Sequence, residues 1–180
     1  MKQYDLRAVK ILCIGLLPLF LFFPTSGIKT IRAKCERVID GDTVEARYGS
    51  RLLKLRLAFI DAPEIKQLSL DKVPIGLRSQ QFLQDLALGK ELVIKVLQKD
   101  RYGRYLAEIY LGKTSLNLTM VESGQAVIYR YYEFQTVQQK VEYMRGEAMA
   151  KRKRLGMWKT FGFYDPHAYR RLKRRSNAKQ

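Results

Sequence analysis

The chain has 180 residues, about the length of one domain, and 47% of them are hydrophobic, which allows a packed core and excludes an intrinsically disordered chain. Its 34 Lys and Arg against 17 Asp and Glu give a formal net charge of +17, which indicates a polyanionic partner, either nucleic acid or an acidic membrane surface. His167, Cys13 and Cys35 are too few and too far apart for a zinc cluster or a disulfide framework. Any catalysis would therefore use carboxylates, Arg, Lys or Tyr, or a cation held by oxygen ligands.

Residues 1–27 have the pattern of a targeting segment. A basic start precedes an apolar run of 13 residues at 11–23, and small residues follow it. This run is shorter than the roughly 20 residues that a membrane-spanning helix needs, so it fits a signal peptide, with a retained N-terminal anchor as the alternative. In either case we expect the rest of the chain to be exported, either secreted, periplasmic or anchored facing outward.

The first half of the globular part is predicted to be strands. Residues 32–39 and 43–48 flank an Asp-Gly turn at 40–43, and residues 52–60 follow a second turn. The third strand alternates, with a row of leucines on one face and Arg56 on the other.

The second half is predicted to alternate helices with two further strands. The prolines at 61–75 indicate a loop. Apolar spacing and glycine stops predict helices at 77–88 and 115–123 and a longer helix from Val137 to Ala148, and the remaining strands are predicted at 92–97 and 104–111.

Five strands with a helix after the third and more helices after the fifth match the OB-fold, a five-stranded Greek-key β-barrel. We therefore expect an α+β protein in which this barrel carries about three helices and follows an N-terminal hydrophobic segment. The barrel domain is expected at residues 32–158. Residues 159–180 are expected to form a basic tail, which can raise affinity for nucleic acid or hold the protein on an anionic bilayer.

Two acidic clusters and two arginines could cut a phosphodiester. Asp40 and Asp42 form one cluster and Asp61 and Glu64 the other. A carboxylate can accept the proton of an attacking water, and Arg can neutralise charge on the phosphate oxygens. Each element alone has an ordinary explanation, since Asp-Gly is usually a hairpin turn and a strand Arg is usually solvated.

The order and spacing of three motifs resemble the staphylococcal nuclease (thermonuclease) family. The motifs are Val38-Ile39-Asp40-Gly41-Asp42-Thr43-Val44, Leu55-Arg56-Leu57-Ala58-Phe59-Ile60-Asp61-Ala62-Pro63-Glu64, and Asp100-Arg101-Tyr102-Gly103-Arg104-Tyr105-Leu106-Ala107. The resemblance continues through Gly76, the 116–124 segment and Glu147-Ala148 to Gly156-Met157-Trp158, and so covers about residues 32–158.

The resemblance implies a calcium-dependent phosphodiesterase on an OB-fold, with Mn²⁺ or Mg²⁺ as alternatives. It implies Asp42, Asp61 and the backbone carbonyl of Ala62 as metal ligands, although Ala62 stands where the family often has Thr. It implies Glu64 as general base and Arg56 and Arg104 as phosphate-binding residues. Asp40 matches a further acid beside the metal.

The family also uses tyrosines near the substrate, and here Tyr129 and Tyr132 are the candidates. Counting from Gly124 places Arg130 at one of the family's tyrosine positions and Tyr132 at the other. Aromatic residues in such a segment are more often core residues, but the interleaved basic residue favours binding to nucleic acid.

The leading hypothesis from the sequence is an exported nuclease, expected to be a monomer, that cuts DNA and RNA with little sequence preference. The alternative is a non-catalytic nucleic-acid-binding or interaction module held at the membrane. All five key side chains are present, which favours the enzyme: Asp42, Arg56, Asp61, Glu64 and Arg104.

Overall fold

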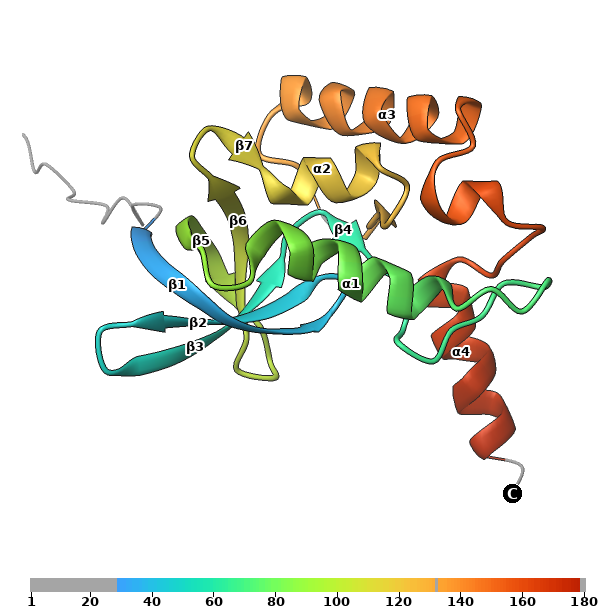
Figure 1. Ribbon diagram of the computed structural model, residues 1–180, viewed down its shortest axis with the longest axis horizontal. Helices are drawn as coiled ribbons and strands as arrows, with labels where there is room; N and C mark the ends of the chain where they lie inside the picture. The colour runs from blue at the N-terminus through green and yellow to red at the C-terminus, as the bar shows by residue number, and fades with distance from the viewer. Residues whose placement is uncertain (1–28, 132, 179–180) are drawn as a thin grey trace, which may run out of the picture.

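The computed structural model describes residues 29–131 and 133–178. Within them the elements follow the order drawn in Figure 1: β1 (Lys29–Asp40), β2 (Thr43–Tyr48), β3 (Arg51–Leu57), β4 (Ile60–Asp61), α1 (Ile75–Ala87), β5 (Glu91–Lys99), β6 (Tyr105–Leu111), β7 (Thr114–Ser115), α2 (Leu116–Glu122), β8 (Val127–Ile128), α3 (Val137–Arg152), the 3₁₀ helix η1 (Gly156–Lys159) and α4 (Pro166–Asn177). The predicted signal peptide or anchor at 1–27 lies outside the described residues, so it stays a prediction.

Five long strands close into a barrel. Antiparallel pairs join β3 to β2, β2 to β1, β1 to β5 and β5 to β6, and a parallel pair between β3 and β6 completes the ring, with Leu55 opposite Tyr105. The predicted five-stranded OB-fold is confirmed. The described residues form four α-helices where about three were expected, and β7 adds a short strand beside β6.

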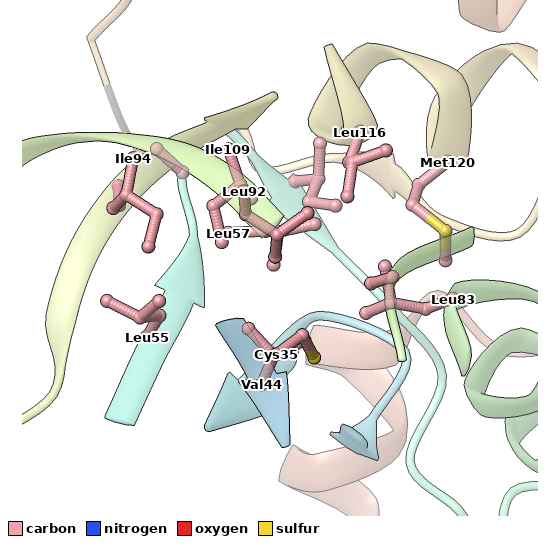
Figure 2. Close-up of a cluster of buried hydrophobic side chains, with 14 of the residues drawn as sticks. Cys35, Val44, Leu55, Leu57, Leu83, Leu92, Ile94, Ile109, Leu116 and Met120 are labelled. Carbon is pink, nitrogen blue, oxygen red and sulfur yellow. The ribbon is translucent and has the colours of Figure 1, made fainter. Parts of the chain in front are cut away.

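Alternating apolar residues of the strands fill the barrel, and the helices close its end. Leu55 and Leu57 are buried as the alternation predicted, while Leu83 of α1 and Met120 of α2 pack into the same core. Figure 2 shows these side chains converging from strands and helices on one cluster. α2 lies between α3 and the barrel (Figure 1). The core therefore fixes the position of the strand ends that carry the polar motifs.

A buried asparagine ties the turn after β3 to the barrel. Asn117 is 0% exposed; its Oδ1 accepts a hydrogen bond from the amide of Ile109 at 2.9 Å, and its Nδ2 donates to the carbonyls of Ala58 and Ala107, each at 3.0 Å. Next in this turn, Phe59 has a φ of 67° and stacks on Phe134, with ring centroids 4.9 Å apart. The uncommon backbone conformation is held by packing, and it sends the chain directly into β4 and Asp61.

The segment after α3 folds back onto the loop at 61–74. The amide of Leu70 donates to the carbonyl of Gly162 at 2.9 Å, and Nε2 of Gln67 donates to the carbonyl of Tyr164 at 2.6 Å. α4 then begins at the side of this loop (Figure 1). The expected basic tail at 159–180 thus contains a defined helix. No helix in the described part of the chain is long and apolar enough to cross a membrane.

Candidate active site

The first acidic cluster is built by the β1–β2 hairpin. Oδ1 of Asp40 accepts the amide hydrogen of Asp42 at 3.0 Å, which shapes the turn. Asp42 is only 4% exposed; its Oδ2 accepts the amide of Ala62 at 2.9 Å, and its Oδ1 accepts the hydroxyl of Thr43 at 3.1 Å. Because the Ala62 amide follows β4, this contact joins the two acidic motifs, 20 residues apart, in one place.

Arg56 bridges the two motifs. It stands opposite Thr43 in the β2–β3 pair, and its side chain is 15% exposed. Its guanidinium contacts a carboxylate oxygen of Asp42 and lies 3.0 Å from Oδ1 of Asp61. Burial lowers the pKa of Arg56, while the charges of Asp61 and Asp40 raise it and that of Arg104 lowers it. Burial also raises the pKa of Asp40, against the opposing charges of Arg56 and Arg104.

Asp61 is the most enclosed acid of the site. It is 1% exposed, in the short β4 strand that pairs with β8. Its carboxylate receives a second guanidinium, since Arg170 of α4 lies 2.6 Å from Oδ2 and 3.1 Å from Oδ1. Two arginines from distant parts of the sequence therefore share one buried carboxylate.

Glu64 occupies a more open position in the following loop. Its side chain is 44% exposed, and Oε1 lies 3.1 Å from Nη1 of Arg170. A Cβ on Gly76 would overlap the carbonyl of Glu64, so the glycine allows the first turn of α1 to approach the Glu64 backbone. Glu64 thus combines a fixed backbone with a carboxylate that water can reach.

Arg104 is held by its own turn. Nε and Nη2 of Arg104 both lie 2.8 Å from Oδ2 of Asp100, and Oδ1 of Asp100 accepts the amides of Tyr102 and Arg104. Burial alone would raise the pKa of Asp100, but these hydrogen bonds and the Arg104 charge outweigh it and lower that pKa. Asp100 therefore fixes the direction of Arg104.

These side chains face a cleft of about 980 Å³. Asp40, Asp42 and Glu64 line it together with Arg56 and Arg104. Asp61 is not part of the lining but is paired with Arg56. Ala62 and Tyr129 also line the cleft. Tyr132 lies outside the described residues, so its expected role stays a prediction.

Part of the cleft wall comes from α4, a helix within the segment that the sequence predicted to be a basic tail. His167, Arg170, Arg171, Arg174 and Arg175 line the cleft. His167 packs its ring on Tyr131, with the ring centroids 4.8 Å apart. The missed signal was Asp165-Pro166, because Asp at the N-cap and Pro at the first position are a helix start.

The donor set fits a hard divalent cation in its chemistry. Arg56 contacts carboxylate oxygens of both Asp42 and Asp61, so these oxygens lie within the span of one guanidinium. Carboxylate oxygens are what Ca²⁺, Mg²⁺ and Mn²⁺ prefer. Among the described residues no three His, Cys, Asp or Glu gather as a metal cluster, so a cation here would also need backbone or water oxygens.

The comparisons agree with this arrangement. A family model described as "Staphylococcal nuclease homologue" matches residues 54–160. A "Micrococcal nuclease" of Shigella flexneri is 37% identical over 149 residues, covering 78% of this chain and 80% of that protein. An "Uncharacterized endonuclease" of Haemophilus influenzae is 32% identical over 163 residues, covering 90% and 85%. The chain therefore belongs to the staphylococcal nuclease family, as its three motifs indicated.

Proposed function

We propose that this protein is an exported nuclease that uses a divalent cation, Ca²⁺ first, to hydrolyse phosphodiester bonds of DNA and RNA with little sequence preference. The observation that carries the proposal is the convergence of Arg56, Asp42 and Glu64 on one cleft with Arg104 at its wall. The names of the relatives, a micrococcal nuclease and an endonuclease, support the same chemistry.

Each residue has a defined part in the proposed hydrolysis. Glu64, exposed to solvent at the cleft, accepts the proton of the attacking water. Arg56 and Arg104 neutralise the charge that collects on the phosphate oxygens. Asp42, Asp61 and the carbonyl of Ala62 would hold the cation. When bound, such a cation stabilises the same negative charge as a Lewis acid.

Asp40 orients the hairpin that carries Asp42, and Tyr129 lines the cleft where a base or a terminal phosphate would lie. A flat aromatic side chain stacks on any base, which is consistent with low sequence preference. Tyr132 is proposed for the same role.

Digestion of plasmid and single-stranded DNA and RNA, with each divalent cation in turn and with EDTA, tests the activity. The Glu64→Gln variant should lose cleavage, while Glu91→Gln, an exposed acid at the start of β5, should cut like the parent. Calorimetric titration of Ca²⁺ into the parent and an Asp42→Asn variant tests the cation site without reference to activity. Equal binding of Ca²⁺ by both proteins would contradict the proposed ligands.

A second candidate is a binding module without catalysis. The observation that favours it is that Arg170 holds both Asp61 and Glu64 in ion pairs. Chelation separates the two functions, because binding without chemistry survives EDTA whereas cleavage stops.

Export is proposed from the N-terminal segment alone. Cell fractionation with N-terminal sequencing of the mature protein would distinguish a cleaved signal from an anchor. An intact Met1 in the soluble fraction would contradict both.

A further inference from the structure

α4 is a basic helix that follows the part of the chain matched by the family model. The match ends at residue 160, and α4 runs from Pro166 to Asn177. Asp165 begins it by accepting the amide of His167 at 3.0 Å. The helix is therefore locally specified, with its own cap, next to the candidate active site.

The arginines of α4 form one stripe, and that stripe faces the cleft. Arg170, Arg171, Arg174 and Arg175 all line the cleft, whereas Lys173 on the same helix does not. The spacing of three and four residues is that of one helical face. The basic side of α4 is thus turned toward the candidate catalytic acids.

The stripe differs along its length in how its charges are paired. Arg170, the first of the four, is paired with Asp61 and Glu64. In the described part of the chain Arg171, Arg174 and Arg175 form no ion pair with an acid. Three guanidinium groups without an acidic partner thus line the cleft, where they can bind an anion.

The rest of the cleft lining is basic as well. Away from α4, Lys54, Arg101 and Arg104 also line the cleft, and Tyr102 presents an exposed ring, with the guanidinium of Arg101 4.9 Å from the ring centroid. Eight Lys and Arg line the whole cleft against four Asp and Glu. A cleft with an excess of positive charge and an exposed aromatic ring suits a polynucleotide backbone.

We propose that the stripe of Arg171, Arg174 and Arg175 is a binding wall for the phosphates of a polynucleotide strand that enters the candidate active site. The identity of the strand as substrate rests on the proposed function. Arg171 to Arg175 covers about 6 Å of helix axis at about 1.5 Å per residue, and B-DNA carries one phosphate per about 3.4 Å of each strand. The stripe therefore matches two or three consecutive phosphates.

A lipid surface fits α4 less well. A helix that lies on a bilayer carries an apolar face of residues such as Trp, Phe and Leu. α4 offers Leu172 and Tyr169 as its large apolar or aromatic residues, and four of its arginines line a cleft. These features favour a strand over a membrane.

The test is the salt dependence of binding by the full chain. The probe is a fluorescent single-stranded phosphorothioate oligonucleotide, followed by anisotropy in EDTA over a series of NaCl concentrations. The variant replaces Arg171, Arg174 and Arg175 by Gln, which keeps helix propensity and leaves Arg170 on its acids. The control replaces three basic residues outside the cleft by Gln, namely Arg152, Lys159 and Lys173.

The slope of log Kobs against log salt should fall by about 2 in the wall variant, since each phosphate contact on a single strand contributes about 0.7. The control should keep the parent's slope. Replacing the same three arginines by Lys should restore it, because the charges return. An unchanged slope in the Gln variant, or an equal fall in the control, overturns the proposal.

Two parallel measurements separate the remaining outcomes. Phosphatidylserine vesicles are offered to the same proteins, and loss of vesicle binding with strand binding retained would overturn the proposal in favour of lipid. Cleavage by the parent tests the proposed function by itself. A parent that binds through the stripe without cutting supports the wall and refutes the nuclease, and a cutting parent whose slope ignores the stripe does the reverse.

Discussion

Replacing Asn117 by Ala should destabilise the fold strongly although the residue touches none of the candidate catalytic side chains. Asn117 satisfies the amide of Ile109 and the carbonyls of Ala58 and Ala107 in a fully buried position. The Ala107 carbonyl keeps a second donor, the amide of Ala58 at 2.8 Å. The other two backbone groups, the Ile109 amide and the Ala58 carbonyl, would thus be left buried without the hydrogen bond to Asn117, each costing roughly 1–3 kcal/mol, so the free energy of unfolding should fall by roughly 2–6 kcal/mol.

Urea denaturation followed by circular dichroism measures this loss, with the slope of the transition compared between proteins to verify that both unfold from a similar folded state. Asn177→Ala, at the exposed end of α4, is the matched control and should change stability by less than about 0.5 kcal/mol. A loss below about 1 kcal/mol for Asn117→Ala would refute the argument that Asn117 is the polar tie between the turn after β3 and the barrel.

Three further predictions address the site and the core. Glu64→Gln should lower turnover by about 10²–10⁴-fold and Arg104→Ala by about 10²–10³-fold, with thermal unfolding unchanged. If either variant digests DNA as fast as the parent, the role assigned to that residue is wrong. Asp100→Asn should lower cleavage roughly 10- to 100-fold, because Arg104 loses its orienting carboxylate, and parent-like kinetics would contradict this. Burial raises the pKa of Cys35 from 9.0 to about 11, so the folded state keeps a proton that the unfolded state releases. The stability that this protonated thiol contributes is complete below about pH 9 and is lost toward pH 11. Between these pH values the free energy of unfolding should therefore fall less in a Cys35→Ala variant than in the parent. Parallel curves of unfolding free energy against pH would contradict the raised pKa of Cys35.

The barrel was predictable because its strands follow simple periodicity. Leu53, Leu55 and Leu57 alternate with Lys54 and Arg56. The structure buries Leu55 and Leu57 and half-buries Leu53. The two-residue strands β4, β7 and β8 carry no such pattern, because two residues cannot show a period. These strands form because tertiary packing brings distant segments together, as β4 and β8 pair beside the buried Phe59 turn.

A shared site for Asp42, Arg56 and Glu64 was expected from the resemblance of the ordered motifs to the family, and all three line one cleft. The contribution of α4 to the cleft could not be predicted from the sequence. A segment of Arg and Lys lacks the apolar stripe from which helices are read, and the ion pairs of Arg170 span 106 and 109 residues of sequence. Such a contact is set by how residues 162–164 dock on the loop, which no local pattern encodes.

The burial of Asp61 decides which variants can report on chemistry. Asp61 is 1% exposed between the guanidinium groups of Arg56 and Arg170, so Asp61→Asn leaves two partly buried cations without this carboxylate. Removing one partner of a buried pair costs about 3–5 kcal/mol. Glu64, far more exposed, should be replaceable by Gln at little cost. Loss of cleavage in Asp61→Asn could thus come from unfolding as well as from a lost catalytic group. Loss of cleavage in Glu64→Gln would report on the catalytic group alone. Urea denaturation of both variants measures the difference, and equal stabilities would contradict the view that Asp61 is a structural as well as a candidate catalytic residue.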